Sequence, residues 1–403
     1  MMSIKMETKN KTYKSMESMN NIVFIDSTTD YPYKFSAGNT KVELLSKGLI
    51  EYGDRITIIN NPIIGSRVVE TFVKDNHNGI TCYTFPKNKS IGSLIRGYTK
   101  IFQILKSSKD PNNRNFIIIS DPPYFFMFLI DYFFAKILGF KLCILFHEWH
   151  IAVDSIGIKQ KIGVYLFDHF AGYMCHAILP ISEFLISKSK KFKKPLLKIP
   201  IIAQFEQPKN SNIIEKKLPT YFLYCGGAQY IKTISVLISH FGRLTREGIN
   251  IDLVLVLYGE KKYFNLIQKK INECNLQDRI TIKSSLPFDE LFNLYCHALA
   301  LLIPLSDTVQ DKARFSQKIA EYLSSRRPII TTNVGEIPVY FKDGINAFIS
   351  DTFKDESFFY KMKFVINNQN LADQVGLNGF QLGKNEFDNM LVSKKLHNFF
   401  NTI

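Results

Sequence analysis

Residues 313–332 contain polar groups suited to binding a phosphorylated ligand. Ser316 is a good helix N-cap, and the apolar residues after it have the spacing of one helical face: Ile319, Ala320 and Leu323. Backbone N–H groups at a helix start attract anions, which makes Ser316 and Gln317 candidate diphosphate ligands. The Glu321 carboxylate, about one turn further along, could accept hydrogen bonds from a ribose diol. Its alternative role is simple stabilisation of the helix.

Three glycines and one lysine form a second candidate phosphate site. Gly38, Gly226 and Gly227 lie where strands are predicted to lead into helices, so their backbone N–H groups could approach a phosphate closely. A plain tight turn is the alternative for each glycine. Lys232 is predicted at a helix start, where a cation opposes the helix dipole; it is either a ligand for an external diphosphate or a solvated lysine.

His147 is the candidate for contact with the reacting groups. It follows a predicted strand, and ligands of parallel sheets bind beyond the carboxyl ends of strands. It could act as a base or contact an acceptor, although many histidines are structural. His150 lies three residues later without an evident third ligand, so we predict no metal site. We also predict no cofactor, because neither G-x-G-x-x-G nor G-x-x-x-x-G-K-[ST] occurs.

The elements that must position these residues alternate between strand and helix. A strand at 22–26, a helix at 39–52 and a strand at 55–59 predict a parallel β-α-β unit. A similar series of units starts with a strand at 221–225. We therefore expect two α/β domains with parallel sheets.

Length and charge limit the classes of partner. A chain of 403 residues allows two or three domains at ~150 residues each. A net charge of +15 favours anionic partners: phosphorylated ligands, anionic lipid or nucleic acid. The six scattered cysteines indicate a reducing compartment. Residues 1–20 are polar and are predicted to be a disordered lead-in, and charged residues interrupt the apolar stretch 125–146, which disfavours a membrane span.

The predicted helix at 91–109 is amphipathic and basic. Its apolar residues fall on one side, while the rest carries Arg96, Lys100, Lys106 and Lys109. Such a helix can lie on an anionic membrane. An ordinary surface helix with a solvated cationic face is the alternative.

Two segments of the second half resemble bacterial glycosyltransferases of the GT-B fold, similar to glycosyltransferase family 4 (group 1). YCGGAQYIKT at 224–233 resembles the family's strand followed by G-R-x-x-x-x-K-G. Gly226 and Lys232 match that pattern, whereas Gly227 stands where arginine is usual. The segment 313–321 resembles E-G-F-G-x-x-x-x-E, with Glu321 at the second glutamate and Ala313 at the first.

The first half carries weaker similarity to the same family. Gly38 matches the glycine loop that approaches the donor phosphates, and His147 matches a histidine facing the cleft between the domains. The resemblance implies two Rossmann-like domains facing that cleft. The implied boundaries are an acceptor domain at 21–205, a linker at 206–219, a donor nucleotide-sugar domain at 220–385 and a C-terminal crossover helix at 386–403.

The implied activity is retaining transfer of a sugar from a nucleotide-diphosphate sugar to a hydroxyl, with a lipid-linked surface glycan as the acceptor. His147 and Glu321 are the predicted catalytic residues. Gly38, Gly226, Gly227, Lys232, Ser316, Gln317 and Glu321 are predicted to bind the donor. We expect a cytoplasmic protein in peripheral contact with the anionic inner face of the plasma membrane. The alternatives are a sugar-nucleotide epimerase of the same fold and, with less support, a nucleic-acid-binding protein; no nucleic-acid partner is expected because the lysines are dispersed.

Overall fold

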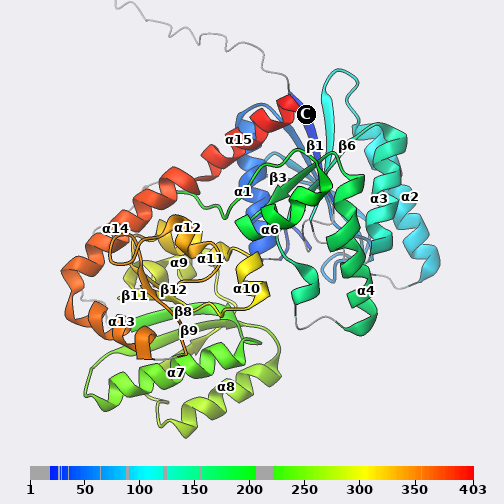
Figure 1. Cartoon of the computed structure of the whole chain (residues 1–403). Coiled ribbons are helices and arrows are strands. Elements are labelled where there is room, and N and C mark those ends of the chain that lie inside the picture. Colours follow the sequence, from blue (N-terminus) through cyan, green and yellow to red (C-terminus); the bar gives the residue numbers. More distant parts are fainter. Residues whose placement is uncertain are drawn as a thin grey trace, which may run out of the picture.

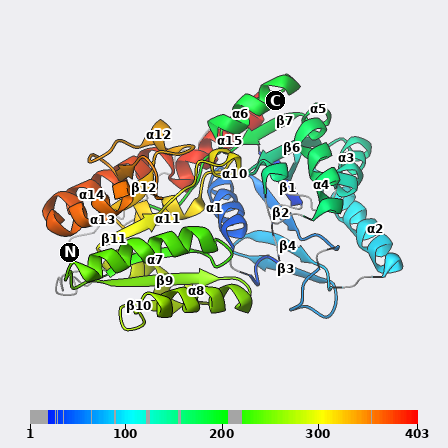
Figure 2. The same cartoon turned by 60° about the horizontal axis from the view of Figure 1, so that its bottom comes forward.

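The computed structural model describes residues 19–25, 28, 30–34, 36–63, 65–87, 90–120, 125–153, 157–205, 221–354 and 356–403. Residues 1–18 of the predicted lead-in and the whole predicted linker at 206–219 lie outside these ranges. Figure 1 shows two α/β lobes joined by a long helical segment near the C-terminus, and Figure 2 shows the same arrangement from another side.

The first lobe is built on a seven-stranded sheet in the order β3-β4-β2-β1-β5-β6-β7. Its strands are β1 (Asn20–Ile25), β2 (Arg55–Ile59), β3 (Val73–His77), β4 (Ile80–Thr84), β5 (Arg114–Ile119), β6 (Lys141–Phe146) and β7 (Ala177–Pro180). Its helices are α1 (Ala37–Glu51), α2 (Ile91–Ser108), α3 (Phe125–Leu138), α4 (Ile158–Leu166), α5 (Gly172–Met174) and α6 (Glu183–Ser189). The short helical turns are η1 (His150–Ala152), η2 (Phe167–Ala171) and η3 (Lys190–Phe192).

The predicted parallel arrangement is confirmed for the strands of this sheet except β3. That strand pairs antiparallel with β4 through a hairpin that the sequence analysis missed. Asn78 and Gly79 at its tip both have positive φ, as a two-residue type I′ turn requires, and Asn-Gly is the usual sequence signal for such a turn. The central strand β1 is buried along its whole length, as expected for a parallel sheet covered on both faces.

The second lobe has a six-stranded parallel sheet in the order β10-β9-β8-β11-β12-β13. Its strands are β8 (Tyr221–Gly227), β9 (Asp252–Tyr258), β10 (Ile280–Lys283), β11 (Ala300–Ile303), β12 (Ile329–Thr332) and β13 (Phe348–Ser350). The helices of this half are α7 (Ile231–Arg246), α8 (Lys261–Glu273), α9 (Phe288–His297), α10 (Val309–Ala313), α11 (Gln317–Ser324), α12 (Ile337–Tyr340), α13 (Glu356–Asn367), α14 (Gln369–Glu386) and α15 (Asn389–Thr402).

The chain returns from the second lobe to the first through α14 and α15 (Figure 1). Between these helices the backbone pairs with Ala203, which accepts from Asn389 N–H at 3.0 Å and donates to the Phe387 carbonyl at 3.0 Å. Helix α15 then packs on α1, where Ser393 Oγ donates to the Leu45 carbonyl at 3.1 Å. The last helix is therefore part of the first lobe's structure.

Close packing of α15 on α1 depends on Gly48. A Cβ at this position would lie 2.5 Å from Ser393 Cβ and 3.1 Å from the Asn389 carbonyl oxygen. We predict that Gly48→Ala lowers the free energy of unfolding by about 1–3 kcal/mol because of this overlap, although alanine is the better helix former. Urea unfolding measures the change. Gly157→Ala is the control, since its Cβ would meet nothing within 4 Å, and an equally stable Gly48→Ala protein would contradict the packing argument.

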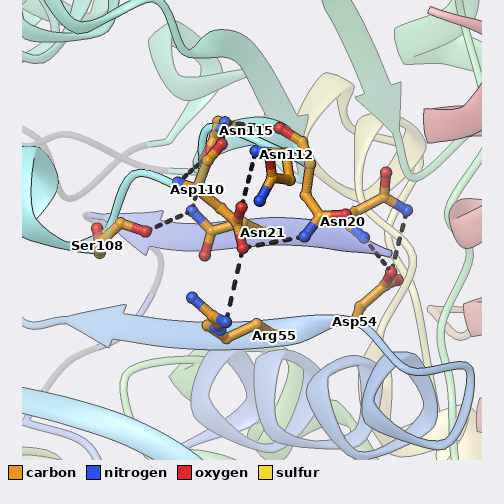
Figure 3. A network of polar contacts seen from close by, with 9 residues as sticks. Asn20, Asn21, Asp54, Arg55, Ser108, Asp110, Asn112 and Asn115 are labelled. Atoms are coloured by element: carbon orange, nitrogen blue, oxygen red, sulfur yellow. Dashed lines mark hydrogen bonds and ion pairs between the residues drawn. The ribbon is translucent and has the colours of Figure 1, made fainter. Parts of the chain in front are cut away.

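A polar network lies at the amino end of the first sheet, where β1 begins (Figure 3). Asn20 donates to Asp54 Oδ1 through its backbone N–H and its side chain, at 2.8 and 3.0 Å. Asn21 Nδ2 donates to Asn115 Oδ1 at 2.8 Å, and His397 Nδ1 on α15 lies 2.9 Å from Asp54 Oδ2. Strand β1 thus begins at Asn20, inside the predicted lead-in. Because the network lies at the amino end of the strand, we interpret it as structural.

Candidate functional site

Helix α11 forms with the N-cap and apolar spacing predicted, and it carries a buried carboxylate. The Glu321 side chain is 4% exposed; its Oε2 lies 3.4 Å from the Tyr295 hydroxyl and 3.8 Å from Lys318 Nζ. Its Oε1 is buried without a hydrogen-bond partner among the described residues. A buried carboxylate oxygen without a partner is costly, so this atom is suited to accept hydrogen bonds from a ligand.

Lys318 is the cation paired with this carboxylate, and the sequence analysis did not select it. Its side chain is 11% exposed, and its Nζ lies 5.7 Å from the centre of the Tyr258 ring at the end of β9. Burial by itself lowers the pKa of the Lys318 ammonium, but the Glu321 carboxylate, with Cys225 and Tyr258, outweighs that effect. The pKa of Lys318 is therefore raised above its usual value, and the side chain carries a positive charge. The sequence signal that could have found Lys318 is its spacing of three residues from Glu321, which places both side chains on the same face of the helix.

The residues predicted at the start of α11 have different environments. Ser316 is the N-cap, but its side chain makes no capping hydrogen bond. Gln317 is buried, and its side chain pairs with both backbone groups of Ile202 in the first half of the chain: Nε2 donates to the carbonyl, and Oε1 accepts from N–H at 3.3 Å. The Gln317 side chain therefore joins the two lobes, which leaves only its backbone N–H for a diphosphate.

Arg314, which follows α10 directly, is a second cation that sequence reasoning missed. Its NH1 donates to the Tyr230 hydroxyl at 2.7 Å, and its NH2 lies 2.5 Å from Asp311 Oδ1. Burial lowers the pKa of the guanidinium, but Asp311, Tyr230 and Glu148 outweigh burial and raise it. Glu148 comes from the first lobe, so Arg314 lies at the junction between the lobes. Its Nε is buried without a hydrogen-bond partner in the described part of the chain.

The three glycines and Lys232 lie at the end of β8 and at the starts of α7 and α1. Gly226 and Gly227 are the last two residues of β8, where they pair with Leu257 and Tyr258 of β9. Lys232 lies in the first turn of α7 and is exposed. Gly38 lies inside the first turn of α1, because Ser36 is the N-cap and accepts a hydrogen bond from Asn39 N–H at 3.1 Å. Gly38 and Lys232 thus lie in the first turns of helices, whereas Gly226 and Gly227 belong to a strand that extends beyond its predicted end at residue 225.

His147 directly follows β6 in the first lobe, as predicted. Its Nδ1 lies 3.2 Å from Ser120 Oγ, which follows β5. These neighbouring parallel strands therefore bring the two side chains together at the carboxyl edge of the sheet.

His150 lies a short distance beyond, in the turn η1. Its Nδ1 is 2.7 Å from Oδ1 of the fully buried Asp168 side chain, whose Oδ2 accepts from Ile151 N–H at 3.0 Å. Asp168 lies in the π-helical turn η2, which separates α4 from α5. The change from α-helix to π-helix therefore occurs at Asp168, whose buried carboxylate holds η1 in place.

Direct contacts hold the two lobes together next to this region. Ser182 Oγ donates to the Ala313 carbonyl at 2.5 Å, and Ala313 is fully buried. Lys198 Nζ lies 2.5 Å from Glu336 Oε2 of the second lobe and 4.8 Å from the centre of the Tyr340 ring. The position at which the resembling family has its first motif glutamate is therefore occupied by a buried alanine against the first lobe.

The described residues contain neither a cluster of metal ligands nor a membrane-spanning helix. Within the described ranges, no three His, Cys, Asp or Glu side chains are grouped so that they could hold a metal ion. None of the helices described combines the length and apolar character needed to cross a membrane.

Comparison with known proteins finds a family model that matches most of the second lobe. Residues 204–382 match the family model of the group 1 glycosyl transferases. The O-antigen chain mannosyltransferase RfbU of Salmonella typhimurium is 25% identical over 218 residues, which is 54% of this chain and 57% of that protein. The alignment thus spans little more than half of that relative.

Solved structures show similarity over nearly the whole chain. Sucrose-phosphate synthase from Thermosynechococcus elongatus aligns with a TM-score of 0.74 and 14% identity, covering 95% of this chain and 98% of that one. HepE from Anabaena, solved with UDP-glucose, aligns with a TM-score of 0.69 and 12% identity, covering 95% and 100%. With the two parallel-sheet lobes, these similarities confirm the predicted GT-B fold.

Proposed function

We propose that this chain, a GT-B protein with a group 1 glycosyl transferase domain, transfers a sugar from a nucleotide-diphosphate sugar to a hydroxyl of a lipid-linked surface glycan, with retention of configuration. The observation that carries the proposal is the buried Glu321 carboxylate beside a charged lysine in this domain. One of its oxygens has no hydrogen-bond partner among the residues that the structure describes. The family match favours transfer over the epimerase alternative.

In this proposal the donor nucleotide lies against the second lobe. Glu321 Oε1 accepts hydrogen bonds from the ribose hydroxyls. Lys318, Lys232 and the N–H groups at the start of α11 face the diphosphate, while Gly38 approaches it from α1. The HepE structure with UDP-glucose supports a nucleotide-sugar donor for this fold.

Arg314 supplies, in this proposal, the guanidinium that the resembling family has at the position of Gly227. Tyr230 holds Arg314 through a 2.7 Å hydrogen bond, and it lies in the β8–α7 connection, which begins directly after Gly227. The guanidinium therefore reaches this connection from a different part of the chain. There it would stabilise the negative charge that develops on the leaving nucleotide as the glycosidic bond breaks.

The first lobe presents the acceptor. His147, held by Ser120, lies near the acceptor hydroxyl. The name of the Salmonella relative supports a surface glycan as the acceptor. Helices α2, α3 and α4 expose lysine and arginine side chains, while their only acidic residue, Asp131, is fully buried. This charge distribution supports peripheral contact with an anionic membrane, and hence a location at its cytoplasmic face.

A thermal-shift screen with UDP-, GDP- and CMP-sugars tests the proposed donor class. We expect the UDP- or the GDP-sugar to raise the melting temperature by about 3 °C or more at a hundredfold excess over its dissociation constant. The CMP-sugar has a single phosphate, and a shift confined to it would contradict a diphosphate donor. The matching nucleoside monophosphate, which lacks the second phosphate, serves as the control and should give a smaller shift. Equal shifts with every nucleotide, or none with any, would contradict a specific donor site.

A further inference from the structure

An apolar groove lies between α2 and α3 on the first lobe. Its volume is about 470 Å³, within the range of small-molecule sites. Nine of its ten lining residues are apolar or aromatic, and the tenth is a threonine: Ile63, Ile91, Leu94, Ile95, Tyr98, Thr99, Phe102, Phe126, Ile130 and Phe134. Figure 1 shows the two helices side by side along one side of the lobe. The groove is therefore built for hydrocarbon and not for a polar ligand.

The rim of the groove exposes large apolar side chains. Ile91 is 78% exposed, Ile95 is 62% exposed and Phe126 is 51% exposed. Exposed apolar side chains that adjoin one another and line a groove usually mark a binding site. Occupation of the groove by a hydrocarbon chain would remove this surface from water.

The exposed charges of the two helices that form the groove are positive. Helix α2 contains no acidic residue and exposes Arg96 and Lys100, and α3 exposes Lys136, whereas its Asp131 is fully buried. An apolar groove between two helices whose exposed charges are all positive is complementary to a molecule in which a hydrocarbon chain is joined to a phosphate. A neutral lipid or an apolar peptide would leave these cations unused.

The groove begins at the edge of the sheet that carries the acceptor side of the proposed site. Helix α3 starts at Phe125, six residues after β5 ends at Ile119. Ser120, which follows β5, pairs with His147 after β6. The first turns of α2 and α3, which line the groove, therefore lie on the same side of the sheet as His147.

We propose that the α2–α3 groove binds the hydrocarbon chain of the acceptor lipid, with the lipid phosphate held by the cations exposed on these two helices. The proposal rests on the proposed function for the acceptor class. The groove thus selects acceptors by their lipid as well as by their glycan.

Binding of a fluorescent farnesyl phosphate, measured by anisotropy, tests the groove without requiring sugar transfer. We expect saturable binding to the full chain, and Ile91→Gln/Ile95→Gln should weaken it about tenfold or more because methylene contacts are lost. Both residues are exposed, so the variant should keep its fold. Ile137→Gln is the matched control: Ile137 is 68% exposed on α3 but does not line the groove, and its replacement should leave binding unchanged.

Three results would overturn the proposal. The first is equal weakening by the control variant, and the second is binding to phosphatidylglycerol vesicles without saturable binding of farnesyl phosphate; both indicate a general membrane surface. The third is self-association of the protein that disappears in the double variant, which would assign the groove to a second copy of the chain. Thermal stabilisation by the nucleotide sugar should be the same in the double variant, so failure of the donor assignment can be recognised separately.

Discussion

Glu321→Gln is expected to raise the donor KM by about 10- to 100-fold while kcat changes by less than about threefold. In the proposed complex the carboxylate contacts the ribose, which does not react, so its loss weakens the ground state and the transition state equally. Glutamine keeps the shape of the side chain and can still contact the Tyr295 hydroxyl, which lies 3.4 Å from Oε2. Steady-state kinetics with varied donor concentration measures both constants.

The effect of Glu321→Gln on donor binding must be separated from its effect on stability, because Glu321 is paired with Lys318. Removing the Glu321 charge leaves the buried Lys318 ammonium without its carboxylate, at a cost of about 3 kcal/mol. Lys318→Met in the same chain should restore part of the stability but not the donor KM. A Glu321→Gln protein with lowered kcat and unchanged KM would show instead that this carboxylate acts at the reacting sugar, as its alternative catalytic assignment implies.

Arg314→Met is expected to lower kcat by about 100- to 1,000-fold, because the leaving diphosphate loses a guanidinium positioned in advance by Tyr230 and Asp311. Methionine keeps much of the side-chain volume. Single-turnover measurement of nucleotide release reports the chemical step directly.

Two controls separate the charge of Arg314 from its packing. Tyr230→Phe removes the 2.7 Å hydrogen bond but keeps the ring under the guanidinium, and we expect a loss of about tenfold or less. Lys312→Met removes a neighbouring cation that is 46% exposed and paired with Asp307, and it should leave kcat unchanged. Equal kcat values for Arg314→Met and the unsubstituted protein would remove Arg314 from the proposed site.

The sequence determined the elements that depend on local pattern. Buried apolar runs and helical spacing predicted the parallel strands and α11, because each pattern is formed by residues close together in the chain. The motif at 313–321 identified Glu321, and its position near a helix start followed from Ser316 as the N-cap. The resemblance of this motif to GT-B transferases predicted the fold, which the similarity to solved structures confirms.

Tertiary structure decided which side chains meet. Arg314 reaches Tyr230 across 84 residues, and Gln317 pairs with Ile202 across 115 residues. No local period encodes such contacts, since they depend on how the sheets and lobes pack. For this reason the sequence did not predict the Gln317 side chain's contact with the first lobe, and it overlooked Arg314.

The α2–α3 groove also depends partly on local sequence pattern and partly on tertiary packing. The sequence predicted that α2 is amphipathic and basic, because spacing along one helix gives its faces. Whether the apolar face is covered depends on the neighbouring helix, and α3 leaves Ile91 and Ile95 exposed beside a groove. A sequence alone thus determines the faces of each helix, while only the packing of several helices decides which faces remain open to a ligand.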